Sequence, residues 1–232
     1  MDVSRLLADR RVLDGVDLSE AELADHLGRG PYHFRDCDLT GAGFGGAMLA
    51  DAVFEGCVLD RADFRGADLD GARFTGGGGA DTRFEDAELI DVRCAGVDLS
   101  GARFGNALLT DTVFTGCRLI GAVLAGCRGI GYMVEGCNLT LADVTGCGFR
   151  DQTLKGVRFD EADLSGCDFT RAVFDGSRLI GARLIGAVFT GADLRGADLG
   201  SPDDGVLRHL KGAVISSTQA AALLAARGLI VG

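Results

Sequence analysis

Residues 61–74, RADFRGADLDGARF, decide the fold of this 232-residue chain, because large apolar residues recur in them every five positions, at Phe64, Leu69 and Phe74. The same frame runs from Phe34 to Leu199, and only Gly79 and Gly129 interrupt its apolar anchors. All 13 Phe residues of the chain lie on these anchor positions. A repeat of fixed period therefore organises most of the chain.

Two further positions of each five-residue unit are also restricted. The residue two before the anchor is small, as in Ala62 and Ala67, and the residue two after it is often Gly, as in Gly56 and Gly66. A period of five fits neither the 3.6 residues of a helical turn nor the two-residue alternation of a strand. It predicts a coil that turns a corner every five residues, where Gly tolerates the backbone angles of the corner.

Three segments carry a family resemblance: RADFRGADLDGARF (61–74), EADLSGCDF (161–169) and GADLRGADL (191–199). They resemble the A(D/N)LXX motif of pentapeptide-repeat proteins. The resemblance implies an all-β solenoid, a right-handed quadrilateral β-helix with four units per coil. Four units per coil imply about 8.5 coils over residues 34–199, or a rod of about 40 Å at the spacing of stacked strands. Residues twenty apart would stack, so the Phe residues would form ladders.

The two ends of the chain are predicted to cap the rod, because bare edges of a repeat array aggregate. Residues 1–33 form the N-terminal cap, with short helices over Val3–Arg11 and Ser19–Leu27. Residues 200–232 form a partial coil over Leu207–Ile215 and a helix over Gln219–Arg227, preceded by a capping-box signal at Ser216.

The C-terminal tail, KGAVISSTQAAALLAARGLIVG, resembles the tail of the gyrase-inhibiting, DNA-mimicking members of the family that are known from mycobacterial fluoroquinolone resistance. In those members the helix mediates a homodimer. The resemblance implies dimerisation through Leu223, Leu224, Leu229, Ile230 and Val231. The alternative is that the tail only caps its own rod.

The repeat has two defects. Gly76–Gly79 removes both inward residues of one unit, and Gly129 removes an anchor while Tyr132 occupies a position that is normally small. One interpretation is local repacking or a bulge, and the other is a bend or a contact site for a partner.

No residue pattern indicates chemistry. Seven of the eight cysteines occupy the small inward position and Cys94 is an anchor, so they are predicted to be buried hydrophobes. The chain has no CxxC pair and its histidines are His26, His33 and His209, so no metal site is expected. Stacked pairs such as Cys117 and Cys137 could approach each other, but a reducing cytosol argues against disulfides. We therefore expect no catalytic residue, no cofactor and no enzyme activity.

Composition limits the partners. The net charge of −11 argues against direct nucleic-acid binding, which needs a basic surface. No apolar run is long enough to span a membrane, and the first eleven residues lack the apolar core of a signal peptide. A cytoplasmic location is expected.

One face of the predicted rod, anchored at Leu49, Leu69, Leu89 and Leu109, concentrates negative charge. It carries no basic residue before Arg128, and its six acids are Asp51, Asp68, Asp70, Glu88, Asp91 and Asp111. They span three coils, about 14 Å, or about one charge per 2–3 Å. Duplex DNA carries about one charge per 1.7 Å of its axis.

This acidic face and the family resemblance together suggest a function. They imply a non-enzymatic DNA mimic that binds DNA gyrase or topoisomerase IV and modulates it, or protects it from quinolone-type or peptide poisons. The alternative is a structural or protein-interaction scaffold with an unidentified partner.

Overall fold

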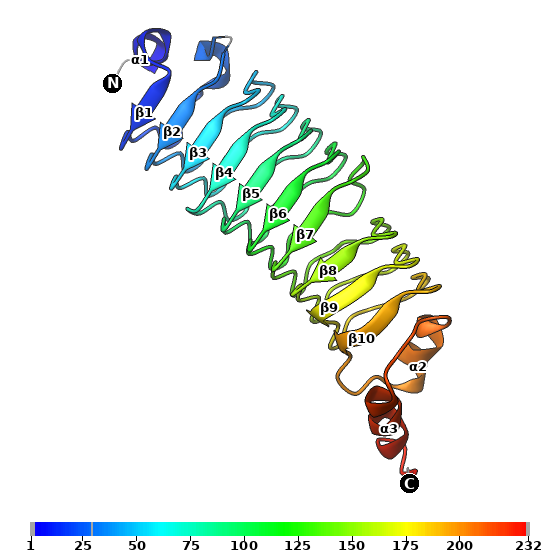
Figure 1. The fold of residues 1–232 in the computed structure, drawn as a ribbon. Helices are drawn as coiled ribbons and strands as arrows, with labels where there is room; N and C mark the ends of the chain where they lie inside the picture. The colour runs from blue at the N-terminus through cyan, green and yellow to red at the C-terminus, as the bar shows by residue number, and fades with distance from the viewer. Residues whose placement is uncertain (1–2, 29, 231–232) are drawn as a thin grey trace.

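The computed structural model describes residues 3–28 and 30–230, which form a rod with the two termini at opposite ends (Figure 1). Its strands are β1 (Val12–Asp14), β2 (His33–Arg35), β3 (Val53–Glu55), β4 (Arg73–Thr75), β5 (Arg93–Ala95), β6 (Val113–Thr115), β7 (Met133–Glu135), β8 (Thr153–Lys155), β9 (Val173–Arg178) and β10 (Asp193–Asp198). Its helical segments are α1 (Val3–Asp9), η1 (Ala24–His26), α2 (Asp204–Leu207), η2 (Arg208–Leu210) and α3 (Ser217–Ala225). The strands stack in parallel along the rod, which confirms the predicted solenoid.

Each five-residue unit makes one side of a coil. In nearly every unit the anchor is buried and the residue two after the anchor has a positive φ, as in Gly56 (64°) and Asp51 (59°). This left-handed conformation turns the corner, and Gly, Asp and Asn tolerate it best. The Asp one before the anchor stabilises the turn, since in the unit centred on Phe64 the carboxylate of Asp63 accepts a hydrogen bond from the backbone N–H of Arg65.

The predicted phenylalanine ladders are confirmed. Phe34, Phe54 and Phe74 stack with centroid distances of 5.0 and 4.7 Å, and Cys94 interrupts this ladder before Phe114. A second ladder comprises Phe44, Phe64, Phe84 and Phe104, and a third comprises Phe149, Phe169 and Phe189. The first two ladders also contact each other edge to face, so the rings fill the interior.

The N-terminal segment departs from the prediction. A helix forms at α1, but the helix predicted for Ser19–Leu27 is wrong. Asp17 and Glu22 bridge the next coil, and only the short η1 turn follows. The Asp17 carboxylate accepts a hydrogen bond from the N–H of Ser19, so this segment makes the same turn as a repeat unit. Leu13, Leu18 and Leu23 are buried five residues apart, and β1 pairs with β2, so the solenoid extends N-terminal of Phe34.

The C-terminal segment closes the other end of the rod. The segment Leu207–Ile215, predicted as a partial coil, makes one bridge to the last strand, between Val214 and Asp193. The beginning of this segment is helical instead, in the last residue of α2 and in η2. Helix α3 has the predicted capping box between Ser216 and Gln219. Within residues 3–28 and 30–230, no helix combines the length and the apolar character needed to cross a membrane.

The Gly76–Gly79 defect is absorbed by local repacking. Gly78 bridges both Val58 and Asp98, so the coil keeps its register. Gly77 lies so close to the preceding coil that a Cβ there would be 2.1 Å from the carbonyl oxygen of Cys57. The Thr82 hydroxyl donates hydrogen bonds to Gly79 and to Leu59 beneath it. The backbone at Gly77 therefore lies close against the preceding coil where the side chains are missing.

Candidate functional site

The acidic face is built by the stacking of successive coils. Asp68 and Glu88 are bridged neighbours in adjacent coils, and the ladder continues through Leu108 to Arg128. The Asp68 carboxylate accepts a hydrogen bond from the N–H of Asp70, which holds the turn between them. These residues lie on the flat side of the rod, and Asp68 is the least exposed of the six acids.

The other three acids line the adjacent corner. Asp51, Asp91 and Asp111 are exposed and all have positive φ, between 54° and 59°. Gly71 separates Asp51 from Asp91 along this corner, and a Cβ on Gly71 would lie 2.6 Å from an Asp51 carboxylate oxygen. The glycine therefore leaves room for the acid of the coil below.

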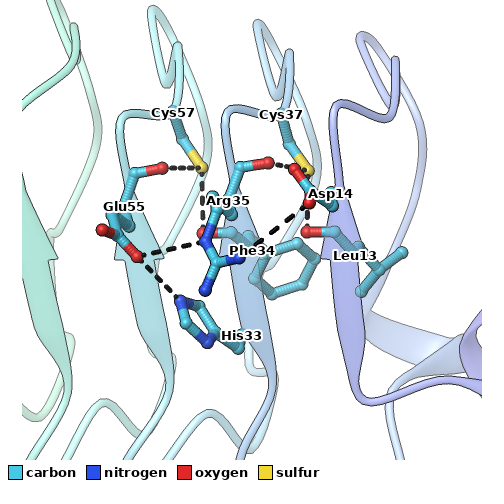
Figure 2. Close-up of polar contacts among 8 residues, drawn as sticks. All are labelled: Leu13, Asp14, His33, Phe34, Arg35, Cys37, Glu55 and Cys57. Carbon is cyan, nitrogen blue, oxygen red and sulfur yellow. Dashed lines mark hydrogen bonds and ion pairs between the residues drawn. The ribbon is translucent and has the colours of Figure 1, made fainter.

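The six acids differ in their pairing from many acids on the other sides of the rod. Within the described part of the chain, none of the six lies within ion-pair distance of a basic group. Elsewhere Arg65 pairs with Asp63 at 2.6 Å and Arg150 pairs with Asp168 at 2.7 Å. Figure 2 shows the same pairing on the strand side, where Glu55 contacts both His33 and Arg35.

Sequence reasoning missed one basic neighbour of the acidic face. Arg93 lies on β5, on the next side of the rod, and its guanidinium donates hydrogen bonds of 3.0 Å to the carbonyl oxygens of Asp91 and Asp111. The sequence assigns each charge to the side of the rod on which its residue's backbone lies. This assignment cannot predict a side chain that reaches around the corner to the next side. The lower half of the acidic face, from Asp51 to Glu88, is therefore the more strongly negative part.

The tail residues are divided between the rod and solvent. The side-chain amide of Gln219 donates to the carbonyls of Leu194 and Ala197 in the last coil, each at 2.8 Å. Leu223 is half-buried and lines a notch between α3 and that coil. Leu224, Leu229 and Ile230 are exposed, Ile230 at 98%. The fifth predicted dimer residue, Val231, lies outside the described residues.

The cysteines are free and, apart from Cys127, buried. In Figure 2 the thiols of Cys37 and Cys57 lie in the interior and donate to backbone carbonyls, including those of Leu13 and Phe34. Burial raises the pKa of Cys94 well above its ordinary value. No group of three potential metal ligands occurs among residues 3–28 and 30–230.

The chain is similar to several solved structures, and one of them has the same fold. The structure of full-length QnrB1, a plasmid-mediated fluoroquinolone resistance protein, has a TM-score of 0.71 and 22% identity, and the match covers 94% of this chain and all of that one. HetL from Nostoc sp. strain PCC 7120, a pentapeptide repeat protein involved in heterocyst differentiation regulation, has a TM-score of 0.43 and 25% identity over 81% of this chain and 86% of its own. None of the curated proteins compared with the chain matches it.

The sequence itself matches a family model. The model for pentapeptide repeats matches eight copies, over residues 34–76, 87–126, 135–171 and 167–200. The gaps between these matches contain the last three residues of the Gly76–Gly79 defect and the whole of the defect at Gly129–Tyr132. The matched residues are more than half of the chain, and the coils of the structure contain all of them. The chain belongs to the pentapeptide-repeat family.

Proposed function

We propose that this protein is a non-enzymatic DNA mimic that acts in the cytoplasm. It binds DNA gyrase or topoisomerase IV through its acidic face, and it modulates the enzyme or protects it from quinolone-type or peptide poisons. The observation that carries this proposal is the set of six carboxylates on one side and corner of a straight rod, none of them within ion-pair distance of a base in the described structure.

Charge spacing supports the proposal. Stacked coils repeat at about 4.8 Å, so the six acids present about one charge per 2–3 Å, close to the spacing in duplex DNA. These surface carboxylates form no ion pair within the described part of the protein. A basic groove can therefore bind them without first breaking an ion pair. A DNA-binding enzyme presents such a groove, and electrostatic complementarity would speed the encounter.

A supercoiling assay with purified gyrase tests the proposal. Added protein should change the rate of supercoiling or the sensitivity of the enzyme to a quinolone. The triple variant Asp68→Lys, Asp70→Lys and Glu88→Lys should lose this effect while remaining folded by circular dichroism. An absence of any effect of the wild-type protein on gyrase and on topoisomerase IV would rule the proposal out.

A matched control is available on the other sides of the rod. Asp38 and Asp143 accept the same turn hydrogen bond as Asp68, from Thr40 and Thr145, and Asp175 follows its anchor as Asp70 does. The triple variant of these three acids to Lys changes the net charge equally. It should retain the effect on gyrase, because the acidic face is intact.

The second part of the proposal is a homodimer through the tail. Leu224, Leu229 and Ile230 are exposed at the extreme end of the rod, where two copies could cover them. Sedimentation velocity should give a dimer for the wild type and a monomer for the variant Leu229→Asp, Ile230→Asp. A monomeric wild type at micromolar concentration would contradict dimerisation without affecting the proposal for the acidic face.

The alternative function is a scaffold for another protein. A pull-down with the wild type and with the Asp68, Asp70 and Glu88 triple variant distinguishes the two. Recovery of a topoisomerase by the wild type alone supports the DNA mimic. Recovery of a different protein by both supports the scaffold.

A further inference from the structure

The stacking of coils is interrupted at one level of the rod. On the side that carries the acidic face, bridges join Leu108 to Arg128 and Gly148 to Asp168, but no bridge joins Arg128 to Gly148 in the described structure. On the adjacent side, β7 ends the seven-stranded sheet and β8 begins the three-stranded one. The separation between β7 and β8 is visible in Figure 1.

The other two sides remain continuous at this level. Asn138 is bridged to Arg158, and Asp143 is bridged to Asp163. The two coils on either side of the interruption are therefore joined by backbone bridges on two sides of the rod. On the other two sides no bridge is formed, and in the described structure only the N–H of Gly136 donates a backbone hydrogen bond across, to the carbonyl of Lys155. Their spacing on the open sides is less constrained than elsewhere in the rod.

Side chains take over part of the lost backbone pairing. The buried hydroxyl of Tyr132 accepts a hydrogen bond of 2.7 Å from the N–H of Gly148, and the amide of Gln152 donates to the Tyr132 carbonyl at 2.9 Å. Tyr132 is buried, and its ring meets that of Phe149 edge to face with the centroids 5.7 Å apart. These contacts satisfy polar groups but leave the coils without a regular ladder.

Two cysteines lie at this interruption. Cys127 and Cys147 occupy the small inward position in adjacent coils, and their sulfur atoms are 3.8 Å apart. Cys127 is the one cysteine of the eight that is partly exposed to solvent. Cys127 lies next to Arg128, where the bridge to Gly148 is missing. Because Cys127 is partly exposed there, an oxidant in solvent can reach it.

We propose that Cys127 and Cys147 form a reversible disulfide that joins the two coils across the interruption when the protein meets a hydroperoxide. A disulfide spans Cα separations of about 4.4–6.8 Å, a range that includes the regular spacing of stacked coils, about 4.8 Å, and also a wider spacing at the interruption. The sulfurs must move from 3.8 Å to bonding distance. The missing bridges on this side permit that movement without breaking backbone hydrogen bonds.

The oxidation proceeds in two steps. The Cys127 thiol loses its proton to solvent, and the thiolate attacks one peroxide oxygen. The O–O bond breaks, and the departing oxygen takes up a proton from solvent and leaves as water or an alcohol, which gives a sulfenic acid. The sulfur of Cys147 then attacks the sulfenic sulfur, the S–O bond breaks, and water leaves with the Cys147 proton. One hydroperoxide accepts the two electrons that the two thiols lose. A hydrogen bond from Cys147 lowers the pKa of Cys127, which favours Cys127 as the attacking thiolate.

A second pair of stacked cysteines provides an internal comparison. Cys117 and Cys137 are also one coil apart, but both are buried and both donate to backbone carbonyls, those of Cys94 and Phe114. They lie beside β5, β6 and β7, which pair continuously. This pair should stay reduced under conditions that oxidise Cys127 and Cys147.

Peptide mapping of the full-length protein tests the proposal. After treatment with dilute hydrogen peroxide and blocking of remaining thiols, trypsin should release residues 119–128 linked to residues 129–150. The second peptide also contains Cys137, which could form the link in place of Cys147. If Cys147 forms it, the Cys137→Ala variant should still give the linked product. The Cys147→Ala variant should give none, and the Cys117→Ala variant should be unaffected. The linked wild type should melt several degrees higher, and dithiothreitol should reverse the shift.

Two results would overturn the proposal. One is oxidation of Cys127 to a sulfinic acid while Cys147 remains blockable as a free thiol in the wild type. The other is resistance of Cys127 to peroxide in the native protein when the same residue reacts after unfolding. Both are read from the wild type, so a variant that fails to fold does not obscure the answer.

Discussion

The rings of Phe44 and Phe64 stack in parallel, with their centroids 4.6 Å apart and an interplanar angle of 1°. Phe64 also stacks on Phe84 and meets Phe54 edge to face at 5.6 Å. Phe64, in the interior of the ladder, thus contacts a ring in its own coil and rings in the preceding and following coils. This packing is the basis of the rod's cohesion, because each coil contacts only its neighbours.

Replacing Phe64 by Ala should be strongly destabilising. We expect a loss of about 3–5 kcal/mol in the free energy of unfolding, because the variant leaves a cavity between stacked coils. Chemical denaturation measures the loss. Phe189→Ala is the comparison, since Phe189 is almost equally buried near the end of the rod but contacts two rings, those of Phe169 and Phe174. An equal loss in both variants would show that the ladder adds nothing beyond burial.

Gly77 should tolerate no side chain. Gly77→Ala places a Cβ against the Cys57 carbonyl oxygen at a position with φ of 77°, so the coil must move outward. The matched variant is Gly66→Ala, at φ of 64° with open space around the Cβ. We expect Gly66→Ala to cost about 1–2 kcal/mol for the left-handed conformation alone. Gly77→Ala should cost clearly more by thermal or chemical denaturation, and equal costs would contradict the close approach.

Gln219 should stabilise the C-terminal end of the rod. Gln219→Ala removes the donor to the carbonyls of Leu194 and Ala197 and half of the capping box on α3. We expect a loss of about 1–3 kcal/mol, because backbone acceptors at the end of the last coil lose their partner. Hydrogen exchange should show faster exchange in α3 and β10. Thr218→Ala, an exposed neighbour on the same helix, should leave both measurements nearly unchanged.

Asp193 should titrate well below an ordinary aspartate. The Arg195 guanidinium, hydrogen-bonded to the carboxylate, lowers the pKa of Asp193 from 3.8 to about 2. Because the folded-state pKa is the lower one, this contribution to stability is complete above pH 3.8 and is lost as the pH falls towards 2. An NMR titration of the Asp193 carboxyl should find its midpoint near 2. In Arg195→Ala the midpoint should rise, and an unchanged midpoint would refute the pairing.

The five-residue period was sufficient to predict which residues are buried. Most anchors from Phe34 onward, most small residues two before them and most corner residues two after them have the predicted roles, because a coil of four similar sides determines them by position. The exceptions include the exposed Gly129, the partly exposed Cys127 and Gly196, which lacks a positive φ. The tail's capping box was also readable, since it depends on the local pair Ser216 and Gln219. For the acidic face, the period placed Asp68 and Glu88 side by side.

The remaining features depend on contacts that the period does not contain. Ser19 resembles a helix N-cap in sequence, but Leu18 and Leu23 pack into a first coil, which pairs with the coil above it. Arg93 reaches the acidic corner from another side of the rod, because a long side chain is not confined to the side that its backbone occupies. The sequence by itself determined the coil, its core and the side of each residue. The tertiary structure alone decided where coils lose their pairing, as at Cys127 and Cys147, because the spacing of neighbouring coils depends on side chains that fill or vacate the interior.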